Sequence, residues 1–531
     1  MTSSKKLLKQ PLLVFRGTKE QATYHDEISI YQGNPLIEAL PEIKTEDNVI
    51  EELAFYPEFL EEERNLPAHQ RLHLIQNVLE LFIVLSPHLD LEQRFSRMIR
   101  SGYIARNPVN RGFWKDINNK VETLRSGNQS NRRRRSTATG FTILGISGVG
   151  KSTAVQAILD LYPQVIYHNR YRNQNHSNTQ LVWLVLECPA DGSVKGLCLN
   201  FFQAVDDILG TSYYQSYTNN GRKTVNELMP LVATAASNVH LGVLVIDEIQ
   251  RLTKLKVGGY EKILDFFVQL INTIGLPVIL VGTYKAWPVL GSEFRQIRRG
   301  TGQGDFIWDR MEEDTDWKVL VNKLWRYQYV RNPCELTPAL SHALYYECQG
   351  ITDFAVKVFM LAQARAITTG KEKLTVGIIK SVAKDCLRTA REVLDALKEG
   401  NLRKLQNCED VYPIDIDEFI QEEHQKLPRD TLATSLPETE DGSIESHTEQ
   451  QQQPLDFSQP KLTADQRTVS TPPKENVRKH FKEQPKKGDV KRDLPEIVMG
   501  GKQRGVSAYE ALKEAGYIQS ATEYPLGYIA K

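Results

Sequence analysis

Residues 145–152 read Gly145-Ile146-Ser147-Gly148-Val149-Gly150-Lys151-Ser152 and match the pattern G-x-x-x-x-G-K-[ST] throughout. The apolar run 141–144 precedes it, and residues 153–159, which follow it, have the apolar spacing of a helix. A loop between a strand and a helix is the context in which this motif binds phosphate groups. The sequence therefore predicts a nucleotide triphosphate site here.

Each residue type in this nucleotide loop (residues 145–152) has a physical task. Its glycines let backbone N–H groups turn inward around phosphate oxygens, helped by the N-terminus of the following helix. Lys151 is expected to reach the β- and γ-phosphates, and the Ser152 hydroxyl to ligate Mg²⁺. A glycine-rich turn without a ligand is the alternative, which the terminal Lys-Ser pair disfavours. The expected contacts to ATP are made by Gly145, Gly148, Val149, Gly150, Lys151, Ser152 and Thr153.

Two adjacent carboxylates, Asp247 and Glu248, end the apolar run 241–246. A buried parallel strand delivers the residues at its carboxyl end to the ligand edge of the sheet. Asp247 is therefore expected to hold Mg²⁺, together with Ser152, and Glu248 to polarise the attacking water. The motif is weak by itself but gains weight from following a nucleotide loop. No Asn-Lys-x-Asp follows the strands, so adenine is the expected base.

Two further residues are candidates for sensing the γ-phosphate. Thr283 follows the apolar run 277–281 and Gly282. Its hydroxyl could contact the phosphate and position the water. An ordinary threonine at a strand end is the alternative. Lys357 lies on an expected helix and could reach back to the nucleotide, although a solvated helix lysine is the competing interpretation.

Three arginines lie shortly after Thr283: Arg295, Arg298 and Arg299. An arginine supplied across a subunit boundary can neutralise the charge that develops on phosphate during hydrolysis. A solvated basic surface or a nucleic-acid contact is the alternative. The sequence does not distinguish which of the three would act.

Composition narrows the class of protein without identifying a partner. The chain has 531 residues, with 66 basic and 66 acidic side chains, so net charge favours no partner. Its six cysteines form no C-x-x-C pair, which indicates buried free thiols in a reducing compartment. No apolar run approaches the length of a membrane span. These features predict a cytoplasmic protein without a membrane partner.

The chain divides into four expected regions. Residues 1–125 form a partly helical N-terminal extension, and 126–310 form the nucleotide-binding core, where apolar runs alternate with helical stretches. Such alternation is typical of a parallel sheet covered by helices on both faces. Residues 311–404 have helical periodicity and form a small lid domain. Residues 405–531 carry opposed charge blocks and form a mostly disordered tail with a short terminal helix.

Several stretches, taken in order, resemble a known family. They are Gly33-Asn34-Pro35-Leu36-Ile37-Glu38-Ala39-Leu40-Pro41, Gly102-Tyr103 with Arg106-Asn107-Pro108, Leu244-Val245-Ile246-Asp247-Glu248-Ile249-Gln250, Val281-Gly282-Thr283 and Gly350-Ile351-Thr352-Asp353. This order resembles TnsC, the AAA+ ATPase regulator of cut-and-paste transposons, and more distantly TniB. The motifs after 145 are generic to AAA+ proteins, whereas the stretches at 33–41 and 102–108 point to TnsC. The long tail is similar to that of larger members, including those with RNA-guided targeting.

The resemblance implies an α/β fold, the AAA+ P-loop three-layer α-β-α sandwich with a parallel sheet. It implies that ATP and Mg²⁺ drive self-assembly into a ring or helical filament around duplex DNA, and that hydrolysis acts as an assembly switch. It also implies two kinds of protein partner: transposase subunits similar to TnsA and TnsB, reached through the tail, and a target-selection protein similar to TnsD or TniQ.

A filament that follows DNA phosphates needs basic and hydroxyl side chains on its inner surface. By their place in the resemblance, the candidates are Lys195 and the run Arg222, Lys223 and Thr224. Arg170 and Arg172, with Tyr171 between them, are weaker candidates. For each residue, a solvated loop cation is the alternative.

Two other classes of function share the nucleotide motifs. A helicase loader or replication initiator of the AAA+ class would not need the stretches at 33–41 and 102–108. A scaffold ATPase with protein partners alone would keep the nucleotide loop and use the tail as an interaction arm. Duplex binding that depends on an ATP analogue separates DNA-binding ATPases from the scaffold.

Overall fold

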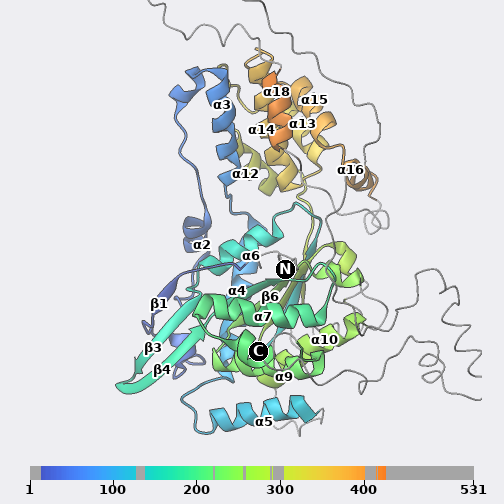
Figure 1. Ribbon diagram of the computed structural model, residues 1–531. Coiled ribbons are helices and arrows are strands. Elements are labelled where there is room, and N and C mark those ends of the chain that lie inside the picture. The colour runs from blue at the N-terminus through green and yellow to red at the C-terminus, as the bar shows by residue number, and fades with distance from the viewer. Residues whose placement is uncertain are drawn as a thin grey trace, which may run out of the picture. The chain divides into compact units, whose positions relative to one another are not determined.

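A computed structural model describes residues 14–126, 138–218, 222–254, 259–287, 290, 304–400, 414 and 416–425, to which all structural statements below refer (Figure 1). The nucleotide loop follows a strand of a five-stranded parallel sheet. The strand order is β5 (Trp183–Glu187), β6 (Val243–Asp247), β7 (Val278–Gly282), β2 (Gly140–Gly145) and β8 (Asp305–Trp308). Because these strands are parallel, their carboxyl ends bring the loop, Asp247 and Thr283 to one edge.

Side chains alternate along each strand between two apolar clusters, one on each face of the sheet. On β6, Val243 and Val245 join one cluster, and Leu244 and Ile246 join the other. One face packs against α4 (Ser86–Ile104) and α6 (Lys151–Asp160); the other packs against α7 (Val194–Leu209), α9 (Val225–Asn238), α10 (Gly259–Gln269) and the π-helical turn η4 (Leu270–Ile274). The expected three-layer α-β-α sandwich is confirmed.

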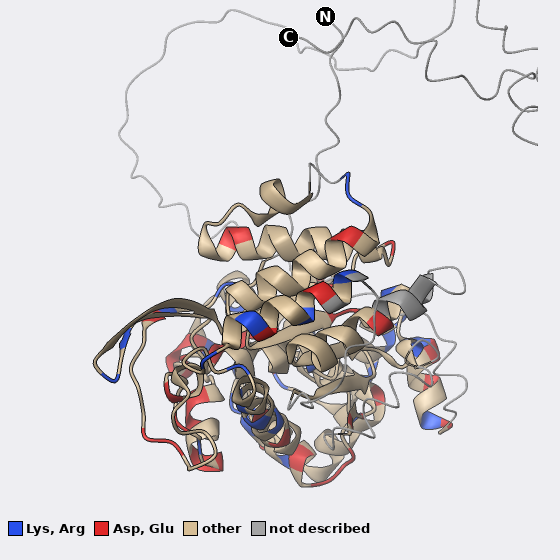
Figure 2. Ribbon diagram, turned by 90° about the horizontal axis from the view of Figure 1, so that it is seen from below, with Lys and Arg blue, Asp and Glu red and all other residues tan. Residues whose placement is uncertain are grey.

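A second, three-stranded sheet has no counterpart in the sequence prediction. Its order is β1 (Lys19–Gln21), β3 (Val165–Tyr171) and β4 (Gln174–Leu181), with β3 and β4 forming an antiparallel hairpin. The apolar run 181–187 is divided between the two sheets: Leu181 ends β4, and the strand of the central sheet begins at Trp183. The hairpin projects beside the helices of the core, with basic residues near its turn (Figures 1 and 2).

The N-terminal extension contacts both the core and the lid. Helices α1 and α2 pack on α4, which packs on α6 of the core, whereas α3 and η2 pack on α14 of the lid. Helix α5 packs on α9 and η4. The bounds are α1 (Pro35–Glu38), α2 (Glu46–Leu53), η1 (Glu61–Asn65), α3 (Ala68–Leu74), η2 (Ile75–Glu80) and α5 (Phe113–Ser126).

A buried ion pair fastens the extension to the lid. The Arg71 guanidinium makes two hydrogen bonds to the Glu372 carboxylate, at 2.8 and 2.6 Å, and a third to the Tyr329 carbonyl. Its side chain is 1% exposed. Phe59 adds edge-on contacts with the rings of Tyr327 and Tyr329. The lid is therefore bonded directly to the extension.

The segment that follows the sheet, for which a helical lid is the sequence prediction, contains five helices within the described residues 304–400. It contains α12 (Thr315–Leu324), α13 (Pro338–Cys348), α14 (Thr352–Thr368), α15 (Val376–Cys386) and α16 (Arg391–Lys398). Helix α18 (Ile416–Gln425) lies within the region expected to be tail, yet it packs on α14. There Glu423, 1% exposed, accepts hydrogen bonds from Arg365 and Thr368. The remaining segments are α8 (Tyr213–Thr218), η3 (Ile249–Lys254) and η5 (Tyr284–Ala286).

Candidate nucleotide-binding site

Two glycines of the nucleotide loop have backbone angles that other residues rarely adopt. Gly148 has φ of 86° and Gly150 has φ of 103°, and α6 begins directly after Gly150. Gly145 has a different reason to lack a side chain, because a Cβ there would overlap the Trp308 carbonyl oxygen on β8. The strand–loop–helix context predicted from the sequence is present.

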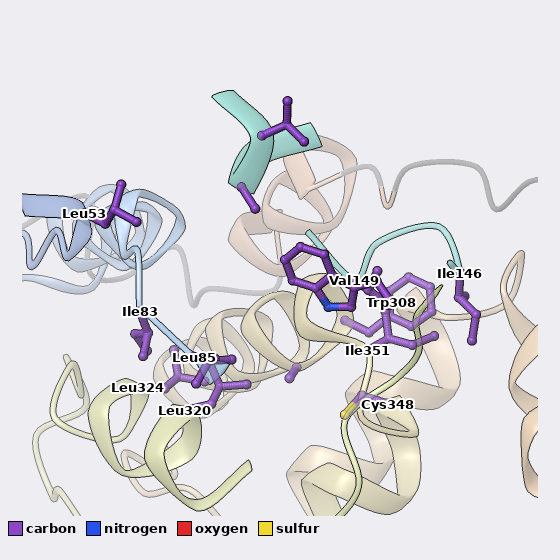
Figure 3. Packing of buried hydrophobic residues seen from close by; sticks show 14 of the residues in the cluster. Leu53, Ile83, Leu85, Ile146, Val149, Trp308, Leu320, Leu324, Cys348 and Ile351 are labelled. Atoms are coloured by element: carbon purple, nitrogen blue, oxygen red, sulfur yellow. The ribbon is translucent and has the colours of Figure 1, made fainter. Parts of the chain in front are cut away.

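The loop is packed between the sheet and the lid. Ile146 and Val149 of the loop lie beside Trp308 of β8 and Ile351 at the start of α14 (Figure 3). The Asp353 N–H donates to the Gly148 carbonyl at 3.0 Å. The conformation of the loop is thus coupled to the position of the lid.

The Lys151 side chain curls back over its own loop. Its Nζ donates to the carbonyl oxygens of Gly145, at 3.1 Å, and Ile146, at 2.7 Å, and the residue is 8% exposed. Carbonyl oxygens are weaker partners for an ammonium group than phosphate oxygens. A bound triphosphate would therefore offer the Lys151 ammonium stronger partners than the two loop carbonyls.

The structure brings Ser152 and Asp247 together. The Ser152 hydroxyl donates to Asp247 Oδ2 at 2.6 Å, and the Glu248 N–H donates to Oδ1 at 2.7 Å. Burial raises the pKa of Asp247, and the hydrogen bonds from Ser152 and Glu248 act in the opposite direction. A divalent cation beside this carboxylate would keep it ionised.

A hydroxyl and a carboxylate are the oxygen ligands that Mg²⁺ accepts alongside water and substrate phosphates. Within the described part of the chain, no group of three His, Cys, Asp or Glu side chains could hold a metal ion. Ser152 and Asp247 fit a nucleotide site in which phosphate oxygens and waters would supply the other ligands. When bound, the ion would supply charge neutralisation at the β- and γ-phosphates.

Glu248 has a left-handed backbone, with φ of 58°, which is strained for a residue with a side chain. Its Oε2 accepts a hydrogen bond from Gln250 Nε2 at 2.8 Å and lies 3.6 Å from Arg251 Nε. Arg251 also bonds Glu187 at the end of β5. Neither Gln250 nor Arg251 has a role in the sequence prediction, although both follow the paired carboxylates directly in the chain.

Thr283 follows β7 beside the acidic strand. Its Oγ1 is buried and makes no hydrogen bond to any described residue, whereas its N–H donates to Gln250 Oε1 at 3.1 Å. A buried hydroxyl without a partner costs free energy. A phosphate oxygen or attacking water would satisfy it, which is the role expected of Thr283.

Lys357 lies one turn into α14 and pairs with Asp353 at 2.9 Å. Because the Asp353 N–H bonds Gly148, the lysine lies close to the nucleotide loop, although its ammonium is engaged by a carboxylate. Arg295, Arg298 and Arg299 lie outside the described residues, so the arginine finger stays a prediction.

The candidate DNA contacts fall on two helix starts and the hairpin. Lys195 lies in the first turn of α7, and Arg222 and Lys223 precede α9. Thr224 caps α9, and its N–H and hydroxyl both bond Glu227, so its hydroxyl already has a partner. Helices α7 and α9 pack against each other.

On the hairpin, Arg170 of β3 is exposed. Arg172 has φ of 46°, and its guanidinium lies over the Tyr171 ring and bonds Glu38 of the N-terminal extension at 3.2 Å. Both arginines are exposed to solvent, but the Arg172 guanidinium is paired with Glu38 of its own chain.

Comparison with known proteins agrees with this geometry. Residues 133–290 match the family model described as AAA domain. The nucleotide loop, the acidic strand and the sheet order define an AAA+ P-loop fold, and the protein is an ATPase. The sequence has no match among curated proteins. No helix in the described ranges is long and apolar enough to cross a membrane.

Solved structures resemble the chain only distantly. ORC1 of Aeropyrum pernix in complex with DNA is 12% identical, with a TM-score of 0.32, covering 62% of this chain and 87% of that one. The Walker-type ATPase PABY2304 of Pyrococcus abyssi is 13% identical, with a TM-score of 0.30 and coverages of 60% and 91%. The RuvB branch-migration motor of Thermotoga maritima is 14% identical, with a TM-score of 0.28 and coverages of 60% and 83%. Scores this low support no inference about function.

Proposed function

We propose that this ATPase is a DNA-binding regulator of DNA transposition, similar to TnsC. ATP binding assembles it as a ring or helical filament on duplex DNA, and hydrolysis acts as the switch that dissolves or remodels the assembly. The assembly links a target-selection protein of the TnsD or TniQ kind to transposase subunits of the TnsA and TnsB kind, with the tail beyond α18 as the transposase contact.

The observation that carries the proposal is that the stretches 33–41 and 102–108, which point to TnsC, are hydrogen-bonded to each other. The Asn34 amide donates to the Tyr103 carbonyl at 2.7 Å, and the Asn107 amide donates to the Gly33 carbonyl at 2.7 Å. Asn34 also caps α1 through Leu36 N–H. Stretches far apart in sequence thus form one unit, as expected if they define a family-specific extension.

This unit is anchored just before β6, the strand that ends at Asp247. The Arg106 guanidinium donates to the carbonyls of Leu241 and Gly242, and the Tyr103 hydroxyl donates to the His240 carbonyl at 2.8 Å. Burial lowers the pKa of Arg106 to about 10. A buried arginine is costly, and here it joins the extension to β6. A helicase loader or initiator shares the nucleotide motifs but has no need for this anchor.

Duplex binding would be electrostatic and largely independent of sequence. Lys195, Lys223 and Arg222 are the proposed phosphate contacts, with Arg170 as a further one. Binding through such side chains weakens steeply with salt, because each neutralised phosphate releases a counterion. Replacing Lys195 and Lys223 by Gln should therefore lower both the affinity and the salt dependence.

The test is a mobility shift with duplexes of unrelated sequence, in ATP, in a non-hydrolysable analogue and without nucleotide. Nucleotide-dependent shifts of all duplexes support the proposal. Equal binding in every nucleotide state, or none, contradicts it, and the latter favours a scaffold ATPase. Co-purification with transposase subunits then separates a transposition regulator from a helicase loader.

A further inference from the structure

Gln250 connects the two residues expected to handle the attacking water. Its Nε2 donates to Glu248 Oε2 at 2.8 Å, and its Oε1 accepts from the Thr283 N–H at 3.1 Å. The side chain is 5% exposed, so these bonds are shielded from solvent. A single amide group therefore spans the gap between β6 and β7 at their carboxyl ends.

The neighbouring backbone makes room for this amide. A Cβ on Gly282 would lie 2.7 Å from Gln250 Oε1 and 2.6 Å from Ile249 Cγ2, so a larger residue there would displace the bridge. Gly282 thus leaves room for the Gln250 amide beside β7.

The strained backbone of Glu248 explains why its side chain needs the hydrogen bond from Gln250. A glutamate whose backbone has a positive φ, as Glu248 does, keeps that conformation only where its surroundings fix it. Its carboxylate can act on water only when it is held within hydrogen-bond reach. The amide holds one oxygen of that carboxylate. The same amide fixes the Thr283 backbone, and with it the unpartnered hydroxyl.

We propose that Gln250 is a positioning residue of the ATPase reaction. It holds Glu248 and Thr283 in fixed positions relative to each other, on either side of the attacking water. The inference rests on Glu248 acting as the water-activating residue. Gln250 touches neither nucleotide nor water in this role and acts through its two partners.

Two substitutions separate the contacts. Gln250→Met keeps the length of the side chain and loses both hydrogen bonds. Gln250→Glu keeps an acceptor for the Thr283 N–H but loses the donor to Glu248 and places two carboxylates together. Gln93→Met is the matched control, because Gln93 donates to Glu92 on α4, away from the nucleotide loop.

The full chain is assayed for ATP turnover and for binding of a fluorescent ATP analogue. Both Gln250 variants should lose at least about 10-fold in kcat, the effect of one hydrogen bond to a charged group. Analogue affinity should stay within about twofold of the parent, since ground-state binding is not the lost interaction. Gln93→Met should retain both properties.

A double-mutant cycle separates positioning from simple loss of structure. In a Glu248→Gln background, Gln250→Met should lower kcat by a smaller factor than in the parent, because the part of its effect that passes through Glu248 is already lost. An undiminished effect there, or a fall in analogue affinity that matches the fall in kcat, overturns the proposal. If Gln250→Met is fully active and Glu248→Gln is inactive, the role of Gln250 is refuted and that of Glu248 stands. If Glu248→Gln is active, the roles of both residues are refuted.

Discussion

The Ser152 hydroxyl lies 2.6 Å from Asp247 Oδ2, and this hydrogen bond joins two residues 95 positions apart in the chain. It joins the end of the nucleotide loop to the end of the acidic strand. The same two oxygens are the proposed protein ligands of Mg²⁺. The hydrogen bond thus marks the position at which the metal is expected.

Replacing Ser152 by Ala should weaken the use of Mg²⁺ without abolishing the fold. The variant loses one ligand, so it should need more Mg²⁺ for half-maximal ATP hydrolysis and reach a lower kcat. A Mg²⁺ titration of turnover measures this. Ser237→Ala is the control, because the Ser237 hydroxyl bonds Ala233 within α9. An unchanged Mg²⁺ requirement in Ser152→Ala contradicts the metal assignment.

Replacing Glu248 by Gln should separate binding from hydrolysis. The amide cannot accept a proton from water, so turnover should fall by about 10²–10⁴-fold, the range for a lost general base. ATP affinity should be retained, and assemblies on DNA should persist after ATP is added. Single-turnover hydrolysis and analogue binding check the two parts. Turnover equal to that of the parent rules Glu248 out.

Replacing Glu372 by Gln should weaken the packing of the N-terminal extension on the lid, and the loss of stability should depend on pH. Burial acts to raise the pKa of Glu372, but the hydrogen bonds from Arg71 and the Arg331 N–H lower it below its ordinary value. A carboxyl with a depressed pKa contributes stability above its unfolded pKa of about 4.3. That contribution is lost as the pH falls through the folded value.

At pH 7 the Glu372→Gln variant should be less stable by about 3 kcal/mol, because Arg71 stays buried without its counter-charge. Urea denaturation at several pH values measures the difference, which should shrink below about pH 4. Glu313→Gln, which removes an exposed contact with His342, should cost less than about 1 kcal/mol. A gap that stays constant down to pH 3 would show that the charge of Glu372 is not its source.

Removing residues 426–531 should leave ATP hydrolysis intact and impair recruitment of transposase. The cut falls after α18 because Glu423 binds Arg365 and Thr368 of the lid, so truncation at 405 would disturb the lid itself. ATPase assays and co-purification with transposase subunits measure the two effects. Complete transposition by the truncated chain would exclude the tail as the contact.

The parts of the site fixed by local patterns could be predicted from the sequence. The nucleotide loop, the acidic strand and the strand before Thr283 each depend on a short run of residues, and parallel strands bring such runs to one edge. The alternation of apolar runs with helical stretches predicts the central sheet. It does not predict β8, because four residues are too few to form a recognisable apolar run.

The contacts that depend on tertiary packing could not be predicted. The hairpin of β3 and β4 carries polar residues such as Asn175 and Asn178, which do not have the apolar alternation of a half-buried strand. The pair of Arg71 and Glu372 joins positions 301 residues apart, and no local pattern links them. The bridge formed by Gln250 likewise depends on how β6 and β7 lie side by side.

We propose that ATP binding, through the nucleotide loop, assembles this protein on duplex DNA. Electron microscopy of the full chain with duplex DNA and a non-hydrolysable ATP analogue tests this proposal, with Lys151→Ala as the matched variant. We expect rings or filaments on DNA for the parent chain and none for Lys151→Ala, which lacks the side chain expected to bind the β- and γ-phosphates. Assemblies formed equally well by Lys151→Ala, or no assembly of the parent on DNA, would contradict it.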